Sequence, residues 1–265
     1  MLLQEYRHVN ADGGEPNPLP SSCLGLVRFP KENAMTVLDE LLSLKQRRIE
    51  QLHCLEPGRT ALLVIDMQRA FLEPGAALEL PPGRAIIPNL QRLIQACRQK
   101  GLPIIFTQFI YSPAVPCLRG DPFGPEHLPA RLGEPIGFGV PSSSCLIAPD
   151  EEKGPNSASI VPELVPCPDE LVVRGHTYDK FLGTPLELVL RSRDVRHLIV
   201  TGVLTDVCVN CTLLSAANRD YRVTAVTDGV ATLWPELQEA CFTIWRRKFA
   251  RLRTAEEILA ELATW

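Results

Sequence analysis

A cysteine stands where an apolar, strand-like run gives way to a helix-like pattern. The run His197–Val200 is followed by Thr201-Gly-Val-Leu-Thr-Asp-Val-Cys-Val-Asn-Cys-Thr212, which places Cys208 at the start of the expected helix. A thiol there faces unpaired backbone N–H groups and the positive end of the helix dipole, and both lower its pKa. The same N–H groups can stabilise an oxyanion. The position suits a thiolate nucleophile, whereas the plain alternative is an inert buried thiol.

A carboxylate ends a second apolar run, far upstream in Thr60-Ala-Leu-Leu-Val-Ile-Asp-Met-Gln68. In open parallel sheets, ligands bind beyond the carboxyl ends of the strands, so Asp66 and Cys208 are expected to converge on one crevice. Asp66 is predicted to act as a general base that takes the thiol proton and later activates water. That task requires a raised carboxylate pKa, which an apolar crevice can supply. The alternative is a simple helix cap.

The elements that must position these two residues alternate along the chain. Strands are expected at 60–65, 103–108, 170–174, 197–200, 222–228 and 250–253. Helices are expected at about 86–100, 185–192, 208–218, 235–249 and from Ala255 onward. This alternation is typical of an α/β fold in which helices cover both faces of a parallel sheet.

Two regions lie outside this pattern. Residues 1 to about 32 are rich in proline and glycine and predict an irregular arm, followed by an amphipathic helix from Ala34 to His53. Its apolar stripe packs either on its own domain or on a neighbouring subunit, which would make the protein a homo-oligomer, a dimer or tetramer. We therefore divide the chain into an extension, 1–55, and a main domain, 56–265. The segment from Tyr111 to about Pro168 predicts a lid with a short helix near Ser157–Leu164.

Composition indicates an ordinary globular protein. Of its 265 residues, 45% are hydrophobic and 22% charged, and the formal net charge is −4. This balance gives no general attraction to nucleic acid or to anionic membranes. The basic cluster at 246–253 is expected to form a solvated face at a helix end. Nine scattered cysteines and the absence of an apolar run of membrane-spanning length favour a cytoplasmic protein.

Three motifs together resemble the isochorismatase-like cysteine hydrolases. They are Val-Ile-Asp-Met-Gln with Phe71, the Cys208 segment with Thr212, and the Tyr-x-x-Phe-x-Gly-Thr element formed by Tyr178, Phe181, Gly183 and Thr184. The resemblance runs from about Thr60 to the C-terminus. It implies a six-stranded, doubly wound sheet and a cis peptide bond between Val203 and Leu204, with the N–H groups of Leu204 and Cys208 as oxyanion donors. It also implies a substrate site that includes Gln68, Phe71, Tyr178, Phe181 and Thr205.

The family's third catalytic residue is a lysine after a middle strand, and here the match is imperfect. The strand-end position is Arg174, with Gly175 as its neighbour; Lys180 is the nearest lysine but falls inside the Tyr-to-Phe element. We expect Arg174 to supply a fixed positive charge, because arginine does not titrate at relevant pH. The alternative is a variant whose third group comes from elsewhere or is missing.

The resemblance implies cysteine-dependent hydrolysis of a C–N bond in a small amide, carbamoyl or ureido substrate, through a thioester acyl-enzyme. Arg174 would favour substrates that carry a carboxylate. The alternatives are hydrolysis of a vinyl ether, as by isochorismatase itself, and a non-catalytic binding protein. The metal-binding histidines of the family's nicotinamidases are missing from 107–111, and His127 is isolated, so neither a metal nor another cofactor is expected.

Overall fold

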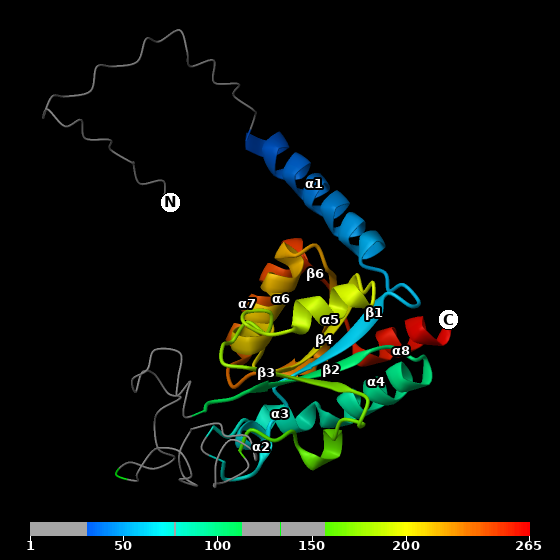
Figure 1. Cartoon of the computed structure of the whole chain (residues 1–265). Helices are drawn as coiled ribbons and strands as arrows, with labels where there is room; N and C mark the ends of the chain where they lie inside the picture. The colour runs from blue at the N-terminus through cyan, green and yellow to red at the C-terminus, as the bar shows by residue number, and fades with distance from the viewer. Residues whose placement is uncertain (1–30, 77, 113–132, 134–156) are drawn as a thin grey trace, which may run out of the picture. The chain divides into compact units, whose positions relative to one another are not determined.

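A six-stranded, all-parallel sheet forms the centre of the molecule (Figure 1). The computed structural model describes residues 31–76, 78–112, 133 and 157–265. The strands are β1 (Thr60–Ile65), β2 (Ile104–Phe109), β3 (Leu171–Gly175), β4 (His197–Val203), β5 (Arg222–Ala231) and β6 (Ala250–Arg253). Their order in the sheet is β3-β2-β1-β4-β5-β6. This confirms the predicted α/β class and the doubly wound, six-stranded architecture.

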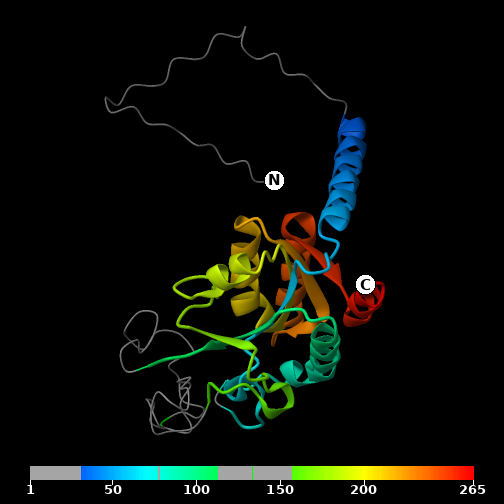
Figure 2. The ribbon, with the colours of Figure 1, turned by 45° about the vertical axis from the view of Figure 1, so that its right-hand side comes forward.

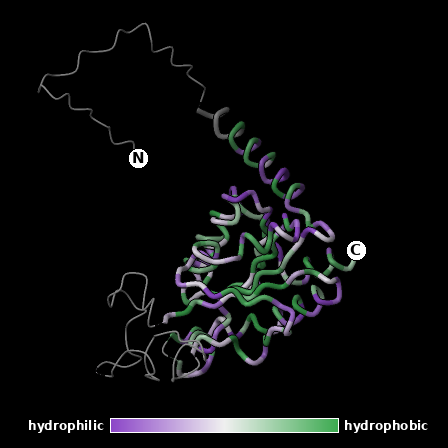
Figure 3. The backbone as a smooth tube through the Cα atoms, in the orientation of Figure 1, coloured by the Kyte–Doolittle hydropathy of each residue, from purple (hydrophilic) through white to green (hydrophobic). Residues whose placement is uncertain are grey.

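The inner strands are apolar on both faces because both faces are covered. Every residue of β1, β2 and β4 is buried, and these strands form the hydrophobic centre of Figure 3. Continuous apolar runs are typical of parallel strands that lie between two layers of helices. The sheet turns from one winding direction to the other between β1 and β4, which is where ligands bind in such folds.

The helices form two layers around the sheet (Figure 2). One core includes side chains of α2 (Arg69–Leu72), α4 (Ile87–Gln99) and α8 (Ala255–Ala263). The short helix α3 (Pro81–Ala85) contacts α2 and α4. The other includes side chains of α5 (Leu186–Ser192), α6 (Asn210–Asn218) and α7 (Pro235–Ile244). Two π-helical turns extend the latter helices: η4 (Thr205–Val209) precedes α6, and η5 (Trp245–Phe249) follows α7.

The strands β1 and β4 approach each other very closely at Gly202. This residue pairs with Ile65 and has a φ of 115°, a conformation that favours glycine. A Cβ atom built on Gly202 would lie 2.0 Å from the carbonyl oxygen of Ile65. The close approach brings the ends of the two strands, and therefore Asp66 and the Cys208 segment, together.

Before the sheet comes the helix α1 (Lys31–Leu52), close to its expected bounds. The chain divides into two units, Met1–Leu41 and Leu42–Trp265. Within the second, Ile49 is buried and Glu50 forms an ion pair with Arg253. The apolar side chains of residues 37, 38, 41, 42 and 44 are exposed. These contacts do not decide whether the apolar stripe of α1 packs on its own domain or on a neighbouring subunit. The division of the chain at residue 55 likewise stays a prediction.

Other expected features fall partly outside the described residues. Residues 1–30 of the arm and 113–132 and 134–156 of the proposed lid, which include His127, are not among them. The short helix expected near Ser157–Leu164 is a single 3-10 turn, η3 (Pro162–Leu164). No helix in the described part of the chain is both long and apolar enough to cross a membrane.

The basic cluster at 246–253 is only partly a solvated face. Arg246, Arg247 and Lys248 are exposed as expected, but Arg251 is buried and donates to Glu261 Oε2 at 2.8 Å. That part of the prediction was wrong because Arg251 lies on β6, beneath α8, rather than on the helix end.

Candidate active site

Asp66 follows β1 directly and is completely buried. Its φ of 50° turns the chain sharply away from the strand direction. The Thr107 hydroxyl, on the neighbouring strand β2, donates to Asp66 Oδ1 at 2.6 Å and accepts from the Asp66 N–H at 3.2 Å. The carboxylate is therefore held in one orientation at the carboxyl end of the sheet.

The positive charge beside Asp66 belongs to Lys180. Its Nζ lies 2.7 Å from Asp66 Oδ2, and both side chains have no solvent exposure. The ammonium also donates to the carbonyl oxygen of Thr177 at 3.1 Å and lies 4.8 Å from the centroid of the Phe109 ring. The ion pair is the only contact of Asp66 Oδ2 among the described residues, because this oxygen has no hydrogen-bond partner there.

Arg174 does not occupy this position, which corrects the expected placement. It lies on β3 in register with Gln108, and its side chain is exposed, with Nε donating to Gln108 Oε1 at 3.3 Å. The strand ends one residue later, at Gly175, and the chain then turns back. The spacing of the motif predicted a positive charge at the end of the strand. In the structure, the turn after β3 instead brings Lys180 next to Asp66.

The turn that carries Lys180 is held by the helix α6. Thr212 Oγ1 accepts from the Lys180 N–H at 3.2 Å and donates to the Tyr178 carbonyl oxygen at 3.3 Å. Ser215 donates to Asp179 Oδ2 at 2.7 Å. Because α6 also continues the segment that holds Cys208, one helix positions the cysteine and fixes the lysine turn.

Cys208 lies in η4, the first turn of the helix, and is only 2% exposed. Burial raises the pKa of its thiol well above the ordinary value; the Lys180 charge lowers this pKa, and the charge and hydrogen bonding of Asp66 raise it. This differs from the low pKa expected for a helix N-terminus, because desolvation of a fully buried thiolate is the larger effect. The resting thiol is therefore protonated and next to a carboxylate.

The segment before Cys208 has the expected backbone form. The peptide bond between Val203 and Leu204 is cis. The Leu204 carbonyl oxygen accepts from the N–H groups of Val207 and Val209, both at 3.1 Å. These bonds start the helical turn around Cys208.

The expected substrate residues separate into two groups. Tyr178 is half-buried, and its ring lies 5.4 Å from that of Phe109, next to Lys180. The other four residues mainly contact the strands, helices and hydrophobic cores of the fold. The Gln68 amide donates to Phe109 O at 2.9 Å and accepts from Phe109 N at 2.8 Å. The rest of this group comprises Phe71, buried in one core, Phe181, stacked on Tyr221, and Thr205, buried and bonded to Gln238.

Sequence reasoning missed Thr107 and passed over Lys180. Thr107 is a polar residue near the end of an apolar strand, directly beside the strand of Asp66, and that pattern could have marked it. The signal for Lys180 is its place between the aromatic residues Tyr178 and Phe181. His176 follows β3, and its Nδ1 lies 2.9 Å from the Ile110 carbonyl oxygen.

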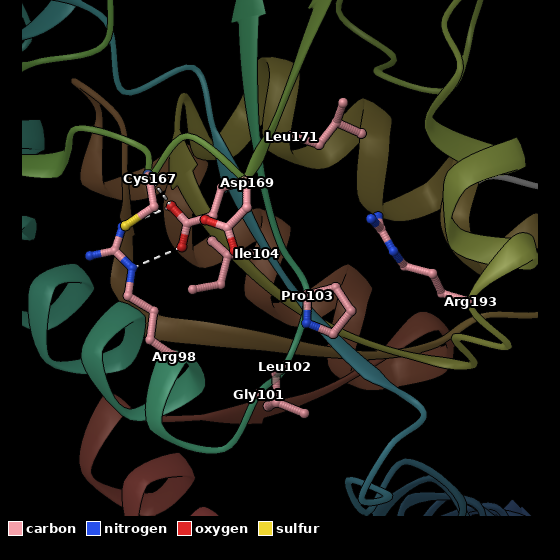
Figure 4. Close-up of a pocket in the computed structure, with 10 residues that line it drawn as sticks. Arg98, Gly101, Leu102, Pro103, Ile104, Cys167, Asp169, Leu171 and Arg193 are labelled. Atoms are coloured by element: carbon pink, nitrogen blue, oxygen red, sulfur yellow. Dashed lines mark hydrogen bonds and ion pairs between the residues drawn. The ribbon is translucent and has the colours of Figure 1, made fainter.

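A separate hollow of about 480 Å³ lies at the opposite, amino end of β2 and β3 (Figure 4). Arg98 and Glu170 form an ion pair at 2.8 Å on one side of it, and Arg193 lies across from them. It does not contact the Asp66 site. Among the described residues, no group of three or more histidine, cysteine or acidic side chains could hold a metal ion.

Comparison with known proteins identifies the family. The isochorismatase domain model matches residues 60–257, and the chain belongs to this family of hydrolases. A cysteine hydrolase from Pseudomonas syringae pv. phaseolicola 1448A is 26% identical, with a TM-score of 0.64 over 80% of this chain and 95% of its own. An isochorismatase-like hydrolase from Alkaliphilus metalliredigens is 25% identical, with a TM-score of 0.60 over 76% and 98%.

An N-carbamoylsarcosine amidase from Thermoplasma acidophilum shares the fold. Its TM-score is 0.57 over 75% of this chain and 97% of its own, at 23% identity. The match of the isochorismatase domain model confirms the family resemblance inferred from the three motifs.

Proposed function

We propose that this protein is a cysteine-dependent hydrolase that cleaves the C–N bond of a small amide, carbamoyl or ureido compound. The observation that carries the proposal is the buried Asp66–Lys180 ion pair next to the buried thiol of Cys208. A nucleophile, a base and a fixed positive charge at one point are the groups that acyl transfer through a thioester requires. Lys180 takes the role expected of Arg174 from its position at the strand end.

In the first half-reaction, the Cys208 sulfur attacks the substrate carbonyl carbon while its proton passes to Asp66. The raised thiol pKa makes this transfer necessary, because little thiolate exists beforehand. The N–H groups of Leu204 and Cys208 are the proposed donors to the oxyanion. The C–N bond then breaks, and Asp66 returns the proton to the leaving nitrogen, so that ammonia or an amine departs.

In the second half-reaction, Asp66 takes a proton from water, and the hydroxide attacks the thioester carbonyl. The C–S bond breaks, the proton returns to sulfur, and the acid product leaves. The Lys180 ammonium, 2.7 Å from Asp66 Oδ2, holds this carboxylate in place during both half-reactions. Tyr178 and Phe109 form an aromatic wall beside the ammonium for the acyl group.

The test is an ammonia-release screen of carbamoyl, ureido and primary amide compounds, combined with intact-mass detection of an acyl-enzyme. We expect Cys208→Ala and Asp66→Asn to lose at least about a hundredfold in kcat. Cys211→Ser, one turn further along the same helix, serves as the matched control and should keep its activity. Turnover in Cys208→Ala would exclude the covalent mechanism.

The two alternatives give different results in the same screen. Turnover of a vinyl ether without release of ammonia would favour isochorismatase chemistry. A chain that binds these compounds but forms no acyl-enzyme would be a binding protein. The reason for the second alternative was a missing lysine, and the position of Lys180 removes that reason.

A further inference from the structure

The hollow at the amino ends of β2 and β3 has an apolar lining. Leu102 and Ile104 are buried there, and Pro103 and Leu171 are half-buried. Its volume of about 480 Å³ falls within the range of about 300–1,000 Å³ that is typical of small-molecule sites. Such sites combine an apolar lining with a few charged or polar groups that fix the orientation of the ligand.

One wall of this hollow is held in a single geometry by an ion pair. Arg98 Nε and Nη2 donate to the two carboxylate oxygens of Glu170, each at 2.8 Å. The Cys167 N–H donates to Glu170 Oε2 at 2.7 Å, and the Glu170 side chain is only 9% exposed. Because Arg98 and Glu170 neutralise each other, the charge that a ligand meets in the hollow comes from other residues.

Two further charged side chains line the same hollow and lie on opposite sides of it. Figure 4 shows Asp169 beside the ion pair, Arg193 across from it, and the apolar side chains of Pro103 and Leu171 between them. Within the described residues, neither Asp169 nor Arg193 forms a side-chain hydrogen bond or ion pair, and both residues are exposed. The hollow thus presents a carboxylate and a guanidinium that are separated by apolar surface.

We propose that this hollow binds an ω-amino acid, a compound with an ammonium group and a carboxylate at opposite ends of an apolar chain. The carboxylate pairs with Arg193, whose planar guanidinium can donate two parallel hydrogen bonds to it. The ammonium pairs with Asp169, and the methylene groups between the two charges lie on Pro103 and Leu171. A simple anion or cation would leave one of the two charged side chains without a partner, so the charge pattern favours a ligand that carries both charges.

The proposed ligand site is distinct from the candidate active site. The strand β3 begins at Leu171, which lines the hollow, and ends at Gly175, before the turn that carries Lys180. A strand rises about 3.3 Å per residue, so the two ends of β3 are about 13 Å apart. Binding in the hollow therefore does not require the catalytic groups, and Cys208→Ala should bind the ligand as the wild-type chain does.

The test is isothermal titration calorimetry of the full chain with a series of ω-amino acids: β-alanine, γ-aminobutyrate, δ-aminovalerate and ε-aminocaproate. We expect the dissociation constant to depend on chain length, because both ends of the ligand must reach their partners at once. Caproate lacks the ammonium group and hexylamine lacks the carboxylate. Each should bind at least about tenfold more weakly than ε-aminocaproate, because each loses one charge-assisted contact.

Substitutions of the two charged side chains test their roles. Arg193→Gln and Asp169→Asn should each weaken the binding of ε-aminocaproate at least about tenfold. Arg193→Lys should keep part of the affinity, because the charge remains while the two-point contact is lost. Arg246→Gln is the matched control: Arg246 is an exposed arginine of η5 that does not line the hollow. It should leave the dissociation constant unchanged.

Three results would overturn the proposal. One is that no member of the series binds to the wild-type chain. Another is that caproate binds as tightly as ε-aminocaproate, which would make the hollow a simple anion site at Arg193. The third is that Cys208→Ala abolishes binding while Arg193→Gln retains it, which would place these compounds in the candidate active site instead.

Discussion

At the scale of single residues, the site depends on a buried ion pair rather than on an exposed charge. Asp66 and Lys180 have no solvent exposure, and Cys208 has almost none. Removing one partner of such a pair leaves an isolated buried charge and strongly destabilises the fold. The intact pair contributes little to the free energy of unfolding, because its attraction roughly offsets the cost of desolvation. The same charges act on the thiol, since Lys180 lowers the pKa of Cys208 and Asp66 raises it.

Lys180→Met should therefore abolish turnover and raise the pKa of Cys208 further. We expect alkylation by iodoacetamide to shift to higher pH, and the free energy of unfolding to fall by about 3–5 kcal/mol. The measurement is a pH series of alkylation rates followed by intact mass. Arg174→Met is the matched control, because Arg174 is exposed on β3 and should leave the thiol unaffected. A larger effect from Arg174→Met would return the catalytic role to the arginine.

At the scale of elements, the site exists because two strands end at the same place. β1 delivers Asp66 and β4 leads into the Cys208 turn, and Gly202 allows the two strands to touch. The third group arrives differently, on a turn after the edge strand β3 that α6 holds through Thr212 and Ser215. The cysteine and the aspartate thus depend on strand pairing, and the lysine depends on a helix contact.

Gly202→Ala should unfold the protein or make it insoluble, because the new Cβ would clash with the backbone of Ile65. Gly101→Ala is the matched control: Gly101 also has a positive φ, but a Cβ there meets nothing within 4 Å. That change should cost only about 1 kcal/mol in the free energy of unfolding. Urea denaturation of the two variants measures the difference. Equal stabilities would show that the strands separate easily at this point.

At the scale of the whole molecule, the two ends of the sheet have different roles. The carboxyl ends hold the candidate site, and the amino ends hold two buried histidines. His53 Nδ1 lies 2.8 Å from the Val223 carbonyl oxygen, and His197 Nε2 lies 3.4 Å from Glu56 Oε1. Burial lowers the pKa of both imidazoles; Arg222 and Arg251 lower both further, and Glu56 opposes the shift at His197.

These histidines should make stability fall in mild acid. An unfolded histidine has a pKa of about 6.5, so below that pH the unfolded chain binds more protons than the folded one. The contribution is fully present above about pH 6.5 and is lost as the pH falls through the lower folded values. Urea midpoints between about pH 8 and 5.5 measure it, above the range where carboxylates titrate. Replacing both histidines by glutamine should flatten the profile, and an unchanged slope would contradict the assignment.

The sequence by itself predicted the parallel sheet, the order of its elements along the chain and the placement of Asp66 and Cys208 in the candidate site. Asp66 and Cys208 each follow an apolar run, and in a parallel sheet those runs must end at one edge, so local pattern was sufficient. The boundaries of most strands differ from the predicted ones by a few residues at most.

Only the tertiary structure decided which cation faces Asp66. Arg174 and Lys180 are six positions apart, and the choice between them depends on how the chain turns after β3. Contacts with Thr212 and Ser215, some thirty residues further on, set that turn. The burial of Cys208 likewise results from packing by elements far apart in the sequence. This burial raises the pKa of the thiol, whereas the helix end alone was expected to lower it. Short-range sequence patterns do not specify such long-range packing. The tertiary structure was therefore needed to place Lys180 beside Asp66.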